Sequence, residues 1–107
     1  IEWNKNKSMT IVLCSRGYPG NYKKNKIIKN KNKIKLSKND FIYHAGTKLK
    51  NGRLFSNGGR VLNITSTGHS FIKIRNKIIK IIKKLNWKDG FYRKDIGWKV
   101  INKHANN

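Results

Sequence analysis

The chain has 107 residues, enough for one domain with one modest core, and at 36% hydrophobic it should fold. Its formal net charge is +22, and a single cysteine excludes an internal disulfide or a cysteine-rich metal site. The sequence has no run of roughly 18 apolar residues, so it predicts no membrane-spanning helix, and no signal peptide is visible.

The charge admits two interpretations. The direct one is a polyanion partner, either nucleic acid or an anionic membrane. The other is compositional drift, because Lys, Asn and Ile make up close to half of the residues and lysine then fills exposed polar positions. Only five of the 26 basic residues are arginine, the side chain best suited to bind phosphates and bases. Composition alone leaves both interpretations open.

An apolar run near the N-terminus predicts the first strand. Residues 9–14 are apolar on both faces, which indicates an internal strand of a sheet. Cys14 lies in this run, and we expect it to be a small core residue rather than a nucleophile. A turn is predicted at residues 15–20, because proline fixes φ and glycine permits tight backbone paths. The structural turn residues are Gly17, Pro19 and Gly20.

The next segment, residues 21–39, consists almost entirely of Lys, Asn and Ile. Residues 27–28 and 33–36 are predicted to form short edge strands, where lysines discourage pairing with other chains. A further strand is predicted at residues 41–45, closed by Gly46.

The stretch 52–68 predicts a hairpin. Apolar and β-branched residues flank an SNGG turn at 56–59, and Asn-Gly-Gly supplies the positive φ angles of a tight reversal. Arg60 stands at the mouth of the second strand. Backbone amides at Gly58 and Gly59, beside this guanidinium, would make an anion site. The alternative is an ordinary hairpin with a solvated arginine.

A change of period after Gly68 predicts one helix. From Phe71 to Leu85, apolar residues recur at helical spacing and basic residues fill most other positions, with Ser70 as the N-cap. The predicted fold is α+β: a small, mostly antiparallel, barrel-like sheet with one covering amphipathic helix at about residues 70–85. Such a helix could lie on a membrane, but a chain this short needs its apolar stripe as core.

The tail concentrates aromatic and acidic residues. Asp89 and Asp95 are two of the four acids in the chain. Asp95 follows Arg93 and Lys94, which suggests an acid that orients a basic pair for phosphate binding. The alternative is a packed turn with a surface ion pair.

No metal site is predicted. The three histidines show no metal-ligand spacing, and they are His44, His69 and His104.

Four motifs occur in an order and spacing that resemble a known family. They are SRGYPG at 15–20, FIYHAGTKLKNG at 41–52, SNGGRVLNITSTG at 56–68 and DGFYRKDIG at 89–97. With Glu2 and Trp3 in the lead-in, they are similar to the C-terminal domain of the phosphoribosylamine–glycine ligases, also called glycinamide ribonucleotide synthetases. The departures lie at Arg16, where the family often has glycine, at residues 23–39, and at His69.

The resemblance implies a chemistry. Family members are ATP-grasp ligases that join glycine to 5-phosphoribosylamine, with ATP and Mg²⁺, to make glycinamide ribonucleotide in de novo purine synthesis. Glycine is activated as an acyl phosphate, which the amine of phosphoribosylamine attacks. The nucleotide site and the magnesium ligands lie in preceding domains. The resemblance therefore implies no cofactor and no catalytic residue in this chain, which alone should be inactive.

The resemblance also implies where substrate lies. The family's C-terminal domain packs against the other domains and helps wall the active site. In related ATP-grasp enzymes a basic pair before a short x-x-Gly tail holds the substrate phosphate. This implies substrate-phosphate binding by Arg93 and Lys94, with Arg60 as a further candidate and Gly58 and Gly59 as a loop facing the active site.

We expect residues 1–107 to be one domain of a longer, cytoplasmic ligase, since the chain starts at Ile1 rather than methionine. The expected partners are the remaining ligase domains and the substrates phosphoribosylamine and glycine, with weak non-specific polyanion binding in addition. The alternative hypothesis is a stand-alone, highly basic nucleic-acid-binding module, whose binding would fall steeply with salt.

Overall fold

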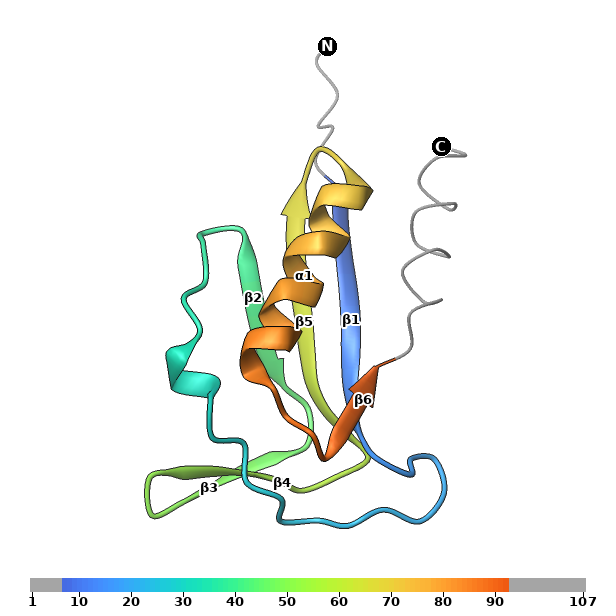
Figure 1. The fold of residues 1–107 in the computed structure, drawn as a ribbon, viewed down its shortest axis with the longest axis vertical. Coiled ribbons are helices and arrows are strands. Elements are labelled where there is room, and N and C mark those ends of the chain that lie inside the picture. The colour runs from blue at the N-terminus through green and yellow to red at the C-terminus, as the bar shows by residue number, and fades with distance from the viewer. Residues whose placement is uncertain (1–6, 93–107) are drawn as a thin grey trace.

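The computed structural model describes residues 7–92, which form two antiparallel sheets and one helix (Figure 1). The elements in chain order are β1 (Lys7–Ser15), the 3-10 helix η1 (Lys31–Lys33), β2 (Asp40–His44), β3 (Thr47–Lys50), β4 (Arg53–Ser56), β5 (Arg60–Gly68), α1 (Phe71–Leu85) and β6 (Gly90–Tyr92). The predicted α+β class, with a mostly antiparallel sheet and one covering helix, is confirmed.

The main sheet has the strand order β2-β5-β1-β6. β1 lies between β5 and β6, which confirms the prediction of an internal strand. Its register pairs Ile11 with Ile64, and a bulge follows between Leu13 and Cys14. Side chains therefore alternate between a face covered by α1 and a face that no helix of residues 7–92 covers.

Helix α1 lies diagonally across the main sheet (Figure 1). It begins after Ser70, whose hydroxyl accepts a hydrogen bond from the Lys73 amide at 3.4 Å, and it ends at Asn86 in the left-handed region. Its apolar stripe is buried against β1 and β5. This stripe comprises Phe71, Ile74, Ile78, Ile81 and Leu85. The predicted helix is confirmed, and no helix of the described part is long and apolar enough to cross a bilayer.

One carboxylate is buried at the edge of the core. Asp40, at the start of β2, accepts hydrogen bonds from Ser66 Oγ at 2.7 Å and from the amide and hydroxyl of Ser37 at 3.1 and 2.8 Å. Lys77 Nζ from α1 lies 2.8 Å from its Oδ1. Burial raises the pKa of this carboxyl, but the hydrogen bonds from Lys77, Ser66 and Ser37 outweigh burial and lower the pKa to about 2.

The predicted hairpin between residues 52 and 68 is wrong. β4 pairs with β3 in a separate two-stranded sheet, and β5 pairs with β1 and β2. The turn of the real hairpin is Asn51-Gly52, with φ of 54° and 74°, the Asn-Gly pair that favours a two-residue reversal. Neither Gly58 nor Gly59 has positive φ, so residues 56–59 connect two sheets instead of reversing within one.

The short edge strands predicted in the Lys/Asn-rich segment are also wrong. Residues 31–33 form η1, and Ile27 makes only an isolated bridge to Phe55. Cys14 likewise differs from its prediction, because it is half-buried on the face away from α1 rather than in the core.

Candidate functional site

Four loops meet at one end of the main sheet, where β1 and β2 end and β5 and β6 begin (bottom of Figure 1). They are residues 16–22, 45–46, 57–59 and 86–89, and we call them the loop cluster. Each belongs to, or adjoins, one of the four motifs. The fold thus brings together segments that are far apart in the sequence.

Hydrogen bonds from Ser15 fix the connection between the two sheets. The Ser15 amide donates to the Gly59 carbonyl and its hydroxyl to the Gly58 carbonyl, both at 2.7 Å. The Asn57 amide donates to the Gly46 carbonyl, also at 2.7 Å. Because Ser15 is buried, its own two bonds are shielded from water. The loop with the double glycine is therefore held from both sides.

Gly59 is required by close packing. A Cβ at this position would overlap the ring of Tyr18, so only glycine lets the aromatic ring lie on the backbone. Gly46 is constrained similarly by the Arg60 carbonyl. A Cβ on Gly58, by contrast, would make only an ordinary contact with Gly46 at 3.5 Å.

Arg60 is exposed and is held by the same tyrosine. Its Nε donates to the Tyr18 hydroxyl at 3.1 Å, and this hydrogen bond raises the pKa of the guanidinium. Tyr18 also makes an edge-on contact with Tyr22, with ring centroids 6.1 Å apart. A positioned cation of this kind can meet an anionic group without first ordering its own side chain.

Arg16 ties the loop after β1 to the loop before β6. Its Nη2 donates to the Lys88 and Gly90 carbonyls at 3.0 and 3.3 Å, and its amide donates to the Asp89 carbonyl at 2.8 Å. Beside it lies a cavity of about 430 Å³, lined by Arg16, Lys23, Lys26 and Asp89 among others. Three cations face one carboxylate there, so the cavity favours anions.

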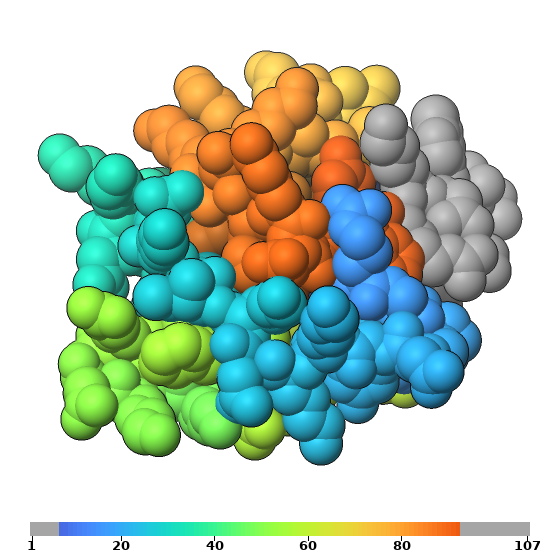
Figure 2. All heavy atoms as spheres, turned by 60° about the horizontal axis from the view of Figure 1, so that its bottom comes forward, coloured from blue at the N-terminus to red at the C-terminus, as the bar shows by residue number. Residues whose placement is uncertain are grey.

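The surface at this end of the molecule is formed largely by the Lys/Asn-rich segment. In Figure 2, residues of this segment (blue to cyan) lie across the end, between the β3–β4 hairpin (green) and the end of α1 (orange). Its backbone is anchored by bonds from the Asn25 and Ile28 amides to the Ser56 and Leu54 carbonyls, at 2.7 and 2.8 Å.

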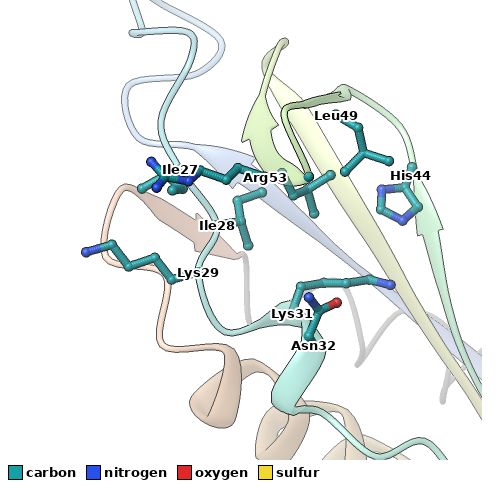
Figure 3. A pocket seen from close by; sticks show the side chains of 10 residues that line it. Ile27, Ile28, Lys29, Lys31, Asn32, His44, Leu49 and Arg53 are labelled. Carbon is teal, nitrogen blue, oxygen red and sulfur yellow. The ribbon is translucent and has the colours of Figure 1, made fainter.

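A second cavity, of about 350 Å³, lies between this segment and the hairpin (Figure 3). Its lining includes the apolar side chains of Ile28 and Leu49, and Lys31 and Arg53 supply positive charge. His44 lines it and shares a 2.8 Å hydrogen bond with the Thr47 hydroxyl. Burial, with the Lys31 charge, lowers the pKa of His44, so the ring is neutral at pH 7. A neutral, hydrogen-bonded imidazole in this setting is a structural group.

The predicted site residues divide into two sets. Arg60, Gly58 and Gly59 lie in or beside the loop cluster, next to the turn with Gly17, Pro19 and Gly20. The predicted phosphate-binding pair, Arg93 and Lys94, and the neighbouring Asp95 lie outside the described residues. The last described residue, Tyr92, pairs with Leu13 in the main sheet.

Sequence reasoning missed two residues of this site. Tyr18 lies in the predicted turn, but no local pattern of the sequence indicates that its ring packs on Gly59. Arg16 was noted only as a departure from the family, although its side chain joins two loops. Among residues 7–92 there is no group of three His, Cys, Asp or Glu side chains that could hold a metal ion.

Comparisons with known proteins bear on this geometry. Residues 8–99 match the family described as "Phosphoribosylglycinamide synthetase, C domain". The chain belongs to this family. It is 36% identical to a phosphoribosylamine–glycine ligase of Brucella melitensis, over 100% of this chain and 25% of that protein. It is 41% identical to the ligase of Agrobacterium fabrum, over 94% of this chain and 23% of that protein.

A solved structure agrees. The phosphoribosylamine–glycine ligase of Thermotoga maritima superposes with a TM-score of 0.65 at 34% identity, covering 82% of this chain and 21% of that one. The chain thus spans about a quarter of the length of the relatives it matches. These matches identify a ligase family and do not support the alternative of a nucleic-acid-binding module.

Proposed function

We propose that this chain is the C-terminal domain of a phosphoribosylamine–glycine ligase, which forms glycinamide ribonucleotide from 5-phosphoribosylamine, glycine and ATP. The observation that carries the proposal is the family match over residues 8–99, and described parts of the four motifs meet at the loop cluster. The domain's role is to wall the active site and to bind the substrate phosphate. The remaining domains of the same ligase are its partners.

The chemistry fits a domain without acid–base residues. The amine of phosphoribosylamine attacks glycine activated as an acyl phosphate, and this step needs positioning and charge neutralisation. ATP and Mg²⁺ supply the activation. Residues 7–92 offer no carboxylate cluster for Mg²⁺, so the proposal assigns no nucleotide or metal step to this part of the chain. The ATP site would lie in preceding domains.

Three cations are proposed to bind the substrate phosphate. Arg93 and Lys94 retain the role that the resemblance implies. Arg60 is the candidate whose geometry supports it, because Tyr18 orients an exposed guanidinium beside a rigid glycine loop. A guanidinium binds phosphate with two parallel hydrogen bonds, so loss of one arginine weakens substrate binding before it affects other ligands.

The test is steady-state kinetics of a complete ligase in which this chain supplies the C-terminal domain. We expect Arg93→Ala to raise the KM for phosphoribosylamine by about 10–100-fold, on the order of the 1.5–3 kcal/mol of a charged hydrogen bond. Arg60→Ala should act in the same direction and less strongly. The KM values for ATP and glycine should stay within about twofold.

Arg53 provides a matched control. It is an exposed arginine on β4 that lines the other cavity (Figure 3). Arg53→Ala should leave all three KM values unchanged. Equal rises for all three substrates in Arg93→Ala would contradict the phosphate-binding role, and a complete ligase that makes no glycinamide ribonucleotide would contradict the proposed function itself.

A further inference from the structure

One face of the main sheet is not covered by any described helix, and we call it the open face. Its residues follow from the strand register, in which partners across a ladder share a face. They are Ser8, Thr10, Val12 and Cys14 on β1, Phe41 and Tyr43 on β2, Asn63, Thr65 and Thr67 on β5, and Phe91 on β6. Helix α1 covers the opposite face of the same strands.

Among the described residues the open face carries no lysine, and its one charged side chain is Arg60 at its end, beside Cys14, although Lys and Arg make up 26 of the 107 residues. Elsewhere among the described residues, lysine occupies many of the exposed positions. The outward side of α1 shows this, with Lys73, Lys80, Lys83 and Lys84. A half-exposed face that excludes lysine in such a chain is under a constraint that the packing of residues 7–92 does not explain.

The open face is also apolar enough to be buried. Phe41 and Tyr43 are 43% and 54% exposed, and their rings stack with centroids 6.0 Å apart at 18°. The Thr10 and Thr65 hydroxyls share one hydrogen bond at 2.7 Å, which satisfies part of their hydrogen-bonding capacity within the row. Exposed aromatic residues amid uncharged neighbours are typical of interaction surfaces.

We propose that the open face is the surface on which this domain docks against the preceding domains of its ligase. This inference rests on the proposed function. The relatives are about four times as long as this chain, so most of each relative lies outside the part that this chain matches. A second copy is disfavoured as the occupant, because two chains of +22 repel each other.

Docking on this face would also place the loop cluster at the edge of the interface. Across the bulge, β5 pairs Arg60 with Cys14, the last open-face residue of β1. Arg60 then stands at the rim, where the sheet meets the loops. The guanidinium would face the cleft between this domain and the rest of the ligase, where a substrate phosphate must lie for the domain to wall the active site.

The test measures the Kd between the 107-residue chain and a truncated ligase. This truncated ligase is the Agrobacterium fabrum enzyme without the C-terminal part that this chain matches. In Tyr43→Lys and Thr65→Lys, the new ammonium group would lose its water on docking without gaining an anionic partner. Each should raise the Kd by at least about tenfold. Ile72→Lys is the control, because Ile72 is 65% exposed on α1, away from the open face. It should leave the Kd unchanged, and circular dichroism should show all three variants folded.

Four outcomes would overturn the proposal. The first is that the unsubstituted chain does not bind the truncated ligase, and the second is that Tyr43→Lys and Thr65→Lys do not weaken binding. The third is that the chain alone forms a dimer which Tyr43→Lys dissociates, and the fourth is that Cys14 is alkylated faster after residues 93–107 are removed. The third would assign the face to a second copy and the fourth to the chain's own tail. A complex that forms through the open face but makes no glycinamide ribonucleotide would instead refute the proposed function and leave the docking surface standing.

Discussion

The two faces of the main sheet differ in the types of residue that they carry. On the covered face, apolar side chains of β1 and β5 pack against α1 and form the buried core, as with Ile11 and Ile64. On the open face, the neighbouring residues of the same strands are uncharged but half-exposed, as with Val12 and Thr65. The covered face is explained by folding alone, whereas the open face is explained by an interaction.

The comparison also reinterprets the charge. A net charge of +22 suggests a polyanion partner when read as a total. Read by location, lysine covers the outward side of α1 and the β3–β4 hairpin but is absent from the open face. In this protein the informative surface is the one that lacks lysine.

The largest expected effect comes from adjacent residues of β1 that face opposite ways. Ile11→Ala on the covered face should lower the free energy of unfolding by about 2–5 kcal/mol, because it leaves a cavity under α1. Val12→Ala on the open face should cost less than about 1 kcal/mol, since Val12 is half-exposed. Urea titrations of both variants measure the difference, and equal losses would contradict the distinction between the faces.

A smaller effect concerns the one carboxylate buried beneath α1. The folded pKa of Asp40 is about 2, below the ordinary value of 3.8, so its ionised form stabilises the fold above pH 4. The free energy of unfolding should therefore fall by about 2 kcal/mol as the pH drops from 4 to 2. Urea titrations across this range measure it. Asp40→Asn should be less stable at pH 7 and should lose most of this slope, and an unchanged slope would refute the assignment.

Two neighbouring glycines at the end of the sheet should differ in how much stability they lose on substitution by alanine. Gly59→Ala should destabilise the fold by about 1–2 kcal/mol, because the new methyl group overlaps the Tyr18 ring and displaces it. Gly58→Ala is the matched control and should cost less, since its methyl group meets only ordinary contacts. Thermal unfolding measures the loss of stability in both variants. A larger loss for Gly59→Ala indicates close packing, whereas equal losses would indicate a general requirement for glycine in the loop.

Much of the fold could be predicted from sequence period. Alternation and apolar runs located β1 and β2, and the spacing from Phe71 to Leu85 located α1 with its cap at Ser70. These signals are local and strong. The open face could not be recognised, because it depends on which residues of four strands become neighbours.

The hairpin and the glycine loop show where local signals compete. Asn51-Gly52 and Asn57-Gly58 are both pairs that favour a chain reversal. Only Asn51-Gly52 forms a hairpin turn, between β3 and β4. Position 59 must be glycine because the ring of Tyr18 packs on its backbone. The two residues are far apart in the sequence, so no local pattern indicates this contact. The phosphate-binding role of Arg93 and Lys94 remains a prediction from the family resemblance.

The most direct test of the open face as an interface uses the only cysteine of the chain. Cys14 lies on this face, and burial raises the pKa of its thiol, so alkylation is slow and sensitive to cover. We would follow alkylation of the Cys14 peptide by mass spectrometry, with and without the truncated ligase at about ten times its Kd. The account predicts a rate about tenfold lower in the complex, with no change for a cysteine placed by Ile72→Cys on α1. An unchanged Cys14 rate in a complex that demonstrably forms would contradict it.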